Sequence, residues 1–313
     1  GSPPHPVRSL RAIVSTSGSS GMADSIILPV PPTTDDRACQ YLIIGHVTKD
    51  IAPGGDRMGG TAAYAGLTAL AYGASPSLVT SCSLDCDLSP LDGVLIQKVF
   101  SGRVTTFENR YNGNTREQWV RSVAEPLGEV HIPRTWLAPE IVHLAPVVGE
   151  VKPGLMDLFL KSLCCVTLQG WMRDWDTDGR VRHIFSPDAE EAARNAHVSV
   201  FSMDDVGGDE ALAAGLAALT PVCAVTDGER GCRVFWRGKA RAIPAPKETV
   251  VDPTGAGDIF AAVFFLRLKE TGDAWEAGRL ATALASLSVT RPGLAGVPTR
   301  EEILQAKRTG IAL

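Results

Sequence analysis

The chain has 313 residues, 44% of them hydrophobic and 21% charged, so it can bury a large core and differs from disordered and fibrous sequences. A formal net charge of -5, with no cluster of Lys and Arg, argues against a nucleic-acid partner, because phosphate binding depends on clustered basic side chains. The apolar run from Ile259 to Leu266 is far shorter than the roughly 20 residues of a membrane span, which predicts no membrane partner.

Residues 1–38 predict a flexible leader. Arg8 and Arg11 precede only a short apolar stretch that runs into a Ser/Gly-rich segment, without the apolar core of a signal peptide. We interpret part of this leader as not native to the protein, with Met22 a candidate native start. Residues 39–313 then predict one folded domain.

Short apolar runs in this domain alternate with helical patterns. Strands are predicted at Tyr41–Ile44, Ser77–Thr80, Ile141–Leu144, Val166–Leu168, Val198–Phe201 and Val222–Val225, and helices at Gly60–Ala71, Leu155–Leu163 and Asp209–Leu219. Such alternation is typical of a doubly wound α/β fold, with a mainly parallel sheet and helices on both faces.

Residues 103–122 break the alternation. Two strand-like runs, 104–108 and 117–120, flank Asn112-Gly113, a dipeptide suited to a type I′ hairpin turn. We predict an antiparallel β flap on the main sheet.

The seven cysteines are odd in number and form no CxxC pair, which is typical of a cytoplasmic protein. Cys82 and Cys86 have a spacing that could suit zinc, but no second Cys/His pair completes four ligands, so two free thiols are favoured. Residues 174–179 resemble the start of a calcium loop, yet Phe185 stands where the bidentate Glu should be, which favours a polar turn. His143, in an apolar strand, is interpreted as a core residue.

The segment from Val250 to Asp258 carries the chemistry. Gly255, Ala256 and Gly257 precede an apolar helix that begins near Asp258, and the free N–H groups at such a helix start favour an anion. Asp258 could be a plain helix-start residue. Two carboxylates around a glycine turn favour a phosphoryl-transfer site instead, in which Asp258 takes the proton of an acceptor hydroxyl.

Competing nucleotide motifs are missing, since the chain has no GxxxxGK[ST] and no GxGxxG between a strand and a helix. The stretch Asp252-Pro253-Thr254-Gly255-Ala256-Gly257-Asp258 resembles the C-terminal signature of the PfkB/ribokinase family of carbohydrate kinases. Three further segments resemble family motifs in the family's order, and the likeness covers about residues 40–308. They are Gly45–Asp50 (GxxxxD), Gly59-Gly60 with the following Thr61-Ala62-Ala63 (di-glycine hinge) and Thr226–Gly231 (TxGxxG).

This resemblance implies a ribokinase-like fold with a small β lid and a kinase that transfers phosphate from ATP, with Mg²⁺, to a hydroxyl of a small sugar or polyol. It implies an anion hole at Gly255, Ala256 and Gly257 and a catalytic base at Asp258. By the same resemblance, substrate is held by Asp50, Gly59, Gly60 and Tyr64, and nucleotide by Thr226, Gly228, Gly231 and Thr254. His46 is a further candidate for a substrate contact, because it lies near Asp50 at the carboxyl end of a strand, where ligands bind in open α/β sheets. It also implies a monovalent cation such as K⁺ near Asp252 and Thr254, closed by residues 290–293.

Two departures from the family pattern stand out. Where many members have NxxE to organise Mg²⁺ through water, this chain reads Ser202-Met203-Asp204-Asp205, so Asp205 keeps one carboxylate for that role. Tyr64 replaces a common Asn after the di-glycine, which argues against a ribose-type contact. Gly45-His46, the 228–233 segment and Asp252-Pro253-Thr254 are similar to the inositol-kinase branch, so an inositol-like substrate is favoured.

Several alternatives stay open at this point. A nucleoside kinase would need an aromatic base-binding pocket under the flap, and the altered Ser202–Asp205 segment is compatible with a catalytically silent ligand-binding homologue. A homodimer in which the lids of two subunits cover each other's sites is also open.

Overall fold

The computed structural model describes residues 40–52, 55–112 and 115–309, so the predicted leader and the tip of the predicted hairpin at Gly113 lie outside the described residues. Nine strands of the described chain form one sheet, in the order β15-β14-β13-β12-β9-β8-β1-β4-β5. Their bounds are β1 Gln40–Ile44, β4 Ser75–Cys82, β5 Leu95–Phe100, β8 Ile141–Leu144, β9 Leu163–Thr167, β12 Val198–Ser202, β13 Val222–Thr226, β14 Cys232–Trp236 and β15 Lys239–Ile243.

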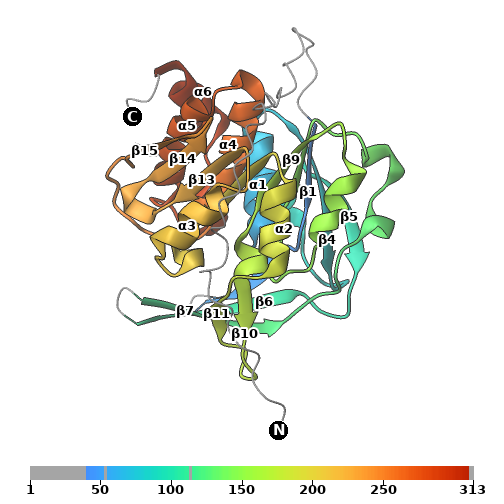
Figure 1. The fold of residues 1–313 in the computed structure, drawn as a ribbon. Coiled ribbons are helices and arrows are strands. Elements are labelled where there is room, and N and C mark those ends of the chain that lie inside the picture. The colour runs from blue at the N-terminus through green and yellow to red at the C-terminus, as the bar shows by residue number, and fades with distance from the viewer. Residues whose placement is uncertain (1–39, 53–54, 113–114, 310–313) are drawn as a thin grey trace, which may run out of the picture.

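Helices cover both faces of this sheet (Figure 1). They are α1 Thr61–Tyr72, α2 Pro187–Asn195, α3 Glu210–Ala217, α4 Ala256–Thr271, α5 Ala274–Ser288 and α6 Arg300–Thr309. Tyr41 and Ile43 of β1 belong to the core cluster that contains α1, α4 and α5, whereas Leu42 and Ile44 belong to the cluster that contains α2 and α3. Both faces of the central strand are therefore buried, as a parallel sheet requires.

The strands from β5 to β13 are parallel to their neighbours, and β14 and β15 add an antiparallel edge. This is the doubly wound, mainly parallel α/β fold that the sequence predicts. Carboxyl ends of parallel strands meet at one edge of the sheet, where ligands bind in open α/β folds. The loops after β1, β12 and β13 lie at this edge.

The lid is a separate four-stranded sheet, not a flap on the main sheet as predicted. Its order is β3-β2-β6-β7, with β2 Thr48–Ile51, β3 Arg57–Gly59, β6 Thr105–Asn112 and β7 Thr115–Ser122. β2 and β3 are not predicted from the sequence, because each strand is too short to show a clear alternation of apolar and polar residues. A hairpin of β10 Arg173–Trp175 and β11 Val181–His183 reaches the outer edge of β7, where Val120 N–H donates to the Gly179 carbonyl at 2.8 Å.

Several smaller predictions can be compared with the structure. The α-helix expected at Leu155–Leu163 is wrong: the chain forms a short 3-10 helix at Pro153–Leu158 and enters β9 at Leu163. Leu155, Met156 and Phe159 pack into the core from this short turn, so their spacing does not require an α-helix. Residues 174–179 form a polar turn, as expected, with the Asp176 carboxylate accepting the N–H groups of Asp178 and Arg180. His143 is fully buried and its two ring nitrogens lie 2.9 and 3.2 Å from the hydroxyls of Tyr41 and Thr167, as expected of a core residue.

The described cysteines form no disulfide, and no group of three or more metal-ligating side chains occurs among the described residues. No helix in the described part of the chain is long and apolar enough to cross a membrane.

Candidate active site

Asp258 lies in the first turn of α4, which begins directly after Gly255. Its Oδ1 accepts a hydrogen bond of 2.7 Å from the Thr61 hydroxyl, at the start of α1. Two helix N-termini therefore meet at this carboxylate, and the first N–H groups of a helix have no partner within the helix. A positive dipole end and a fixed carboxylate are thus placed side by side.

Burial raises the pKa of Asp258 from its ordinary value to about 6. The nearby carboxylates of Asp205 and Asp50 raise it further, while the Thr61 hydroxyl and the Arg173 guanidinium oppose the rise. A carboxyl group with a pKa near the operating pH is well matched to accept a proton and later release it. These interactions also show that Asp50, Asp205 and Arg173 are all close enough to act electrostatically on Asp258.

The loop that precedes α4 needs glycine at residue 255. Gly255 has φ +82°, a left-handed conformation, and an added Cβ would lie 2.3 Å from the Tyr64 ring. Tyr64 is 1% exposed and lies beneath this loop instead of facing an open cleft. Burial, followed by the charges of Asp258, Asp50 and Asp252, raises the pKa of the Tyr64 phenol, so it stays neutral. Tyr64 supports this loop, and its direct role in substrate binding stays a prediction.

Asp50 lies in β2, beside the two glycines that lead into α1. Its Oδ1 accepts a hydrogen bond of 3.1 Å from the Thr48 hydroxyl, and a Cβ on Gly59 would lie 2.5 Å from its Oδ2. Gly60 has φ +88°, and a Cβ there would lie 2.7 Å from the His46 carbonyl oxygen. The structure thus brings Asp50, Gly59 and Gly60 together, because only glycines let β3 turn into α1 against this strand.

His46 is fully buried and has no ring nitrogen available for a substrate. Its Nε2 donates to the Glu125 carbonyl at 2.9 Å, and its Nδ1 lies 2.7 Å from the Thr105 hydroxyl of β6. Its backbone N–H donates to the Glu150 carboxylate, which also accepts the N–H groups of Val147 and Val148. His46 therefore ties the end of β1 to the lid. The sequence suggested a ligand-facing position because His46 follows the first strand, but the folded lid covers it.

Asp205 is buried at the carboxyl end of β12. Its Oδ2 accepts the Ser202 N–H at 2.8 Å, and its own N–H donates to the Ser202 hydroxyl at 3.1 Å. The serine that replaces the family's Asn thus orients the carboxylate that remains. An oriented carboxylate close to Asp258 suits the water shell of Mg²⁺, which prefers oxygen ligands and keeps several waters.

The expected nucleotide residues follow β13. Thr226 ends this strand, and its carbonyl accepts the Met203 N–H at 2.8 Å, which joins the ends of β12 and β13. Gly228 and Gly231 both have positive φ, and a Cβ on Gly231 would lie 2.1 Å from the Ile243 carbonyl oxygen. The turn is therefore a tight glycine turn at the same sheet edge as Asp258.

Asp252 joins three segments. Its Oδ1 accepts the Thr254 N–H at 2.9 Å, and its Oδ2 accepts the Gly293 N–H at 2.9 Å and lies 3.5 Å from Arg57 Nη1. Burial works against its ionisation, but these hydrogen bonds and the Arg57 charge outweigh it and lower the pKa of Asp252. Arg57 belongs to β3 of the lid, so this ion pair connects the lid to the signature loop.

Arg173 is a site residue that the sequence analysis missed. Its Nη1 donates to the Val147 carbonyl at 3.2 Å, and its guanidinium lies 5.3 Å from the centre of the Phe107 ring in β6. No sequence motif identifies this arginine, because only the folded position of β10 brings it close to Asp258.

The fold and the site together define a class: a doubly wound α/β protein with an additional small β sheet and with a carboxylate in the first turn of a helix that follows a glycine loop. Residues 182–300 match the family model described as pfkB family carbohydrate kinase. The fold is similar to a pyrophosphate-dependent kinase in the ribokinase family, with a TM-score of 0.70, 23% identity, and coverage of 85% of this chain and 99% of that one. Ribokinase from Arabidopsis thaliana, solved with ribose and ATP, has a TM-score of 0.64 at 16% identity, over 86% of this chain and 98% of that one.

Sequence relatives agree with this class. An inositol 3-kinase from Zea mays is 34% identical over 167 residues, which are 51% of this chain and 42% of that protein, so the match spans less than half of the relative. A cytidine kinase from Thermococcus kodakarensis is 28% identical over 248 residues, 71% of this chain and 86% of that protein. The chain is thus similar to carbohydrate kinases of the pfkB family over residues 182–300, and its fold is similar to that of ribokinase-family kinases.

Proposed function

We propose that this protein is an ATP-dependent kinase that phosphorylates a hydroxyl of a small polyol, with an inositol-like substrate favoured. The observation that carries the proposal is the carboxylate of Asp258, held by Thr61 at 2.7 Å in the first turn of α4, directly behind the glycine loop. A carboxylate next to an anion-binding helix start is what transfer of a phosphoryl group to a hydroxyl requires.

In this mechanism Asp50 accepts hydroxyl hydrogen bonds and orients the substrate. Asp258 accepts the proton of the acceptor hydroxyl while the hydroxyl oxygen forms a bond to the γ-phosphorus. The bond between this phosphorus and the β-phosphate oxygen breaks, which releases ADP. The N–H groups of residues 255–257 stabilise the charge on the transferring group. Asp205 would hold Mg²⁺ through water, and the ion supplies charge neutralisation between the phosphates when bound.

The donor is proposed to be ATP, held by Thr226, Gly228, Gly231 and Thr254. Two observations support it: glycine turns with positive φ at the end of β13, and the Arabidopsis ribokinase that was solved with ATP. Pyrophosphate is the second candidate donor, because the fold is also similar to a pyrophosphate-dependent kinase.

A nucleoside acceptor is the main alternative substrate, supported by the likeness to the cytidine kinase. A nucleoside base would need an aromatic face under the lid. Phe107 is 3% exposed, and Arg173 lies over its ring. This aromatic face is covered by a cation, which favours a polyol.

A cytoplasmic location is proposed from the thiol usage. A homodimer through the lid also stays a prediction, and it would have to form away from Val120, where the β7 edge already pairs with Gly179.

Phosphate transfer from labelled ATP or labelled pyrophosphate to myo-inositol, ribose, fructose and cytidine would test the proposal, with Asp258→Asn as the matched inactive control. We expect transfer from ATP to myo-inositol to be the most efficient, and transfer to cytidine alone would favour a nucleoside kinase. Absence of transfer to every acceptor from both donors, with ligand binding retained, would instead support a silent binding homologue.

A further inference from the structure

The carboxylate of Asp252 is already surrounded by positive and hydrogen-bond-donating groups. Three donors approach it: the N–H groups of Thr254 and Gly293, each at 2.9 Å, and the Arg57 guanidinium at 3.5 Å. A carboxylate has about four lone-pair positions, so three donors take most of them. The Asp252 side chain is 15% exposed, so water screens these interactions only partly.

This environment does not fit the monovalent cation that the family resemblance implies at Asp252 and Thr254. Such an ion needs several oxygens directed at it, as in the carbonyl rings that replace the hydration shell of K⁺. Here the Val289 carbonyl accepts the N–H groups of Val251 and Asp252, at 2.7 and 3.0 Å, instead of facing an empty position. A guanidinium next to the same carboxylate also repels a second positive charge.

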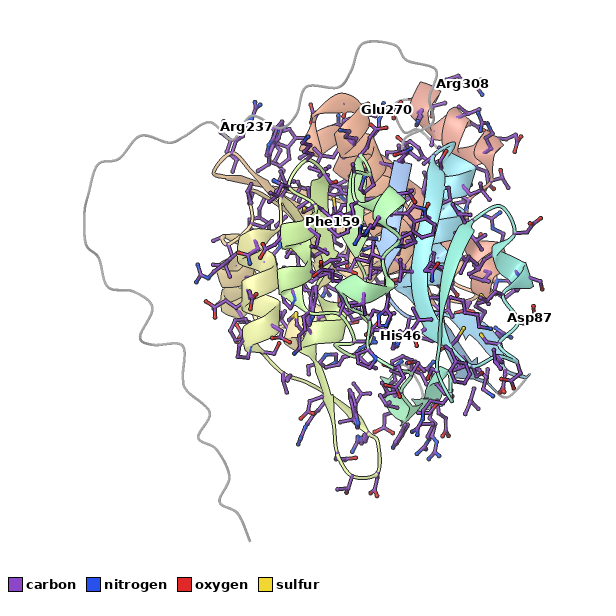
Figure 2. The ribbon with its side chains drawn as sticks, turned by 90° about the vertical axis from the view of Figure 1, so that its right-hand side faces the viewer. His46, Asp87, Phe159, Arg237, Glu270 and Arg308 are labelled. Carbon is purple, nitrogen blue, oxygen red and sulfur yellow. The ribbon has the colours of Figure 1, made fainter. Side chains whose placement is uncertain are left out.

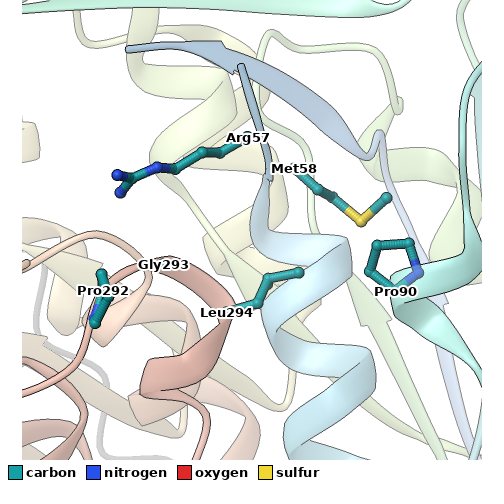
Figure 3. A pocket seen from close by; sticks show the side chains of 6 residues that line it. All are labelled: Arg57, Met58, Pro90, Pro292, Gly293 and Leu294. Atoms are coloured by element: carbon teal, nitrogen blue, oxygen red, sulfur yellow. The ribbon is translucent and has the colours of Figure 1, made fainter. Parts of the chain in front are cut away.

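We propose that Arg57 supplies the positive charge at this position and that the enzyme does not require a monovalent cation. Figure 3 shows Arg57 and Met58 leaving β3 in opposite directions, with the Arg57 side chain on the side of residues 292–293. Both residues line a pocket of about 380 Å³ together with Pro90, Pro292, Gly293 and Leu294. The side chain therefore spans from the lid to the loop that closes the signature turn.

The placement of Arg57 has a further consequence for the lid. In the lid sheet Arg57 pairs with Asp50, the residue proposed to hold the substrate hydroxyls. Arg57 also acts on the Tyr64 phenol, which lies beneath Gly255. Because a side chain of the lid carries the charge, the charge reaches the signature loop only while β3 is docked. A free ion bound at the signature loop would not depend on β3, whereas the Arg57 charge does.

The test compares K⁺ with tetramethylammonium at constant ionic strength, in the wild type and in Arg57→Met and Arg57→Lys. We expect kcat/KM and Tm of the wild type to be the same in both salts. We expect Arg57→Met to lower kcat/KM about tenfold. This loss is smaller than the roughly hundredfold or greater loss that follows removal of a hydrogen-bond donor to the transition state. Added guanidinium ion should restore part of this loss, and Arg57→Lys should keep most of the activity.

Arg194→Met serves as the matched control, because Arg194 is a similarly exposed arginine paired with a carboxylate on α2, far from the signature loop. A rise in wild-type kcat/KM, or in wild-type Tm, that occurs with K⁺ and not with tetramethylammonium would overturn the proposal, as would an Arg57→Met variant with unchanged kcat/KM. The measurement of kcat/KM rests on the proposed function, whereas the measurement of Tm does not. If no acceptor is phosphorylated, the proposed function fails, and K⁺-dependent stabilisation of the wild type still decides the cation question.

Discussion

At the scale of single residues, the site depends on one carboxylate whose protonation is set by its surroundings. Asp258 is held by Thr61 and is hard to ionise because the protein around it replaces water. A residue that served only as a helix cap would not need to be buried, because the helix dipole stabilises an ionised Asp at a helix N-terminus that is exposed to solvent.

Replacing Asp258 with Asn is therefore expected to lower kcat by roughly 100- to 10,000-fold, the usual contribution of general-base catalysis. Asn keeps the size of the side chain and removes a charge that is costly to bury, so Tm should stay equal or rise. Steady-state kinetics, calorimetry and nucleotide titration would measure these quantities. Near-normal turnover combined with a lower Tm would mean that the residue is a cap and that the proposed mechanism is wrong.

The raised pKa of Asp258 also predicts a pH dependence. The carboxylate form is the base, so kcat/KM of the wild type should rise with pH through about 6 and then level off. Stability should change in the opposite direction. An unfolded Asp titrates near 3.9, so the stabilisation from this group is complete below about pH 4 and is lost as the pH rises through the folded value. The Tm of Asp258→Asn relative to wild type should increase over this range, and a constant difference would contradict the assignment.

Gly255 offers a second test at this scale. Gly255→Ala introduces both a left-handed alanine and a contact with the Tyr64 ring, whereas Gly272→Ala at the end of α4 introduces the left-handed residue without a neighbour within 4 Å. We expect the control to lose about 1 kcal/mol of unfolding free energy with unchanged kcat. Gly255→Ala should lose more, and its kcat should fall because the anion-binding loop moves. Equal effects of the two variants on kcat would show that the loop is not part of the site.

At the scale of elements, the four-stranded sheet predicted to be a lid brings several of the proposed site residues together. It carries Asp50 on β2, Arg57 on β3 and the Thr105 contact to His46 on β6. Phe107 and Val120 of this sheet pack against Val147 and Val148, so ligands that bind between the sheet and the rest of the protein should tighten this packing.

We expect hydrogen exchange between Thr105 and Val120 to slow when substrate and nucleotide are added together. The helix α6, which lies away from the lid, provides the internal control and should exchange at an unchanged rate (Figure 1). Mass spectrometry of peptides from both regions would measure this. If saturating ligands leave the exchange of the lid peptides unchanged, the four-stranded sheet is not a closing lid.

At the scale of the whole molecule, charged side chains join the helices on one face of the sheet. Glu270 of α4 accepts hydrogen bonds from Tyr72 of α1, Arg267 of the same helix and Lys307 of α6, and Arg267 also contacts Glu276 of α5. Burial disfavours the charge of Glu270, yet these partners outweigh burial and lower its pKa. Figure 2 shows Glu270 near the top of the molecule and His46 in its lower half, so this network lies away from the site and is expected to act on stability.

Glu270→Ala should therefore reduce the free energy of unfolding by about 1–2 kcal/mol, a value that allows for solvent screening of a half-exposed network. The matched control, Glu190→Ala, removes a single exposed pair with Arg194 and should lose only about 0.3–0.5 kcal/mol. Because the pKa of Glu270 is lowered in the folded protein, its contribution is present at neutral pH and is lost as the pH falls through the folded value. Urea unfolding at pH 7 and pH 4 would measure both effects, and kcat should not change.

The sequence by itself determined the parts of the protein that depend on neighbours along the chain. The strands of the parallel sheet can be recognised as apolar runs in the sequence. The stretch from Asp252 to Asp258 predicts glycines and a carboxylate at the start of a helix. Gly59 and Gly60 were predicted from their resemblance to the family's di-glycine motif, and Gly60 adopts a positive φ that favours glycine. Local patterns failed at residues 155–163, where apolar spacing fits a helix as well as a buried strand.

Only the tertiary structure decided which side chains from distant segments reach the site. Thr61 contacts Asp258, Arg57 reaches Asp252 and Arg173 acts on Asp258 because the lid, the β10 turn and α1 pack against one edge of the sheet. The same packing buries His46 and Tyr64, which the sequence placed in the substrate site. A side chain's partners across the fold depend on which distant segments pack together, and no local pattern along the chain encodes that packing.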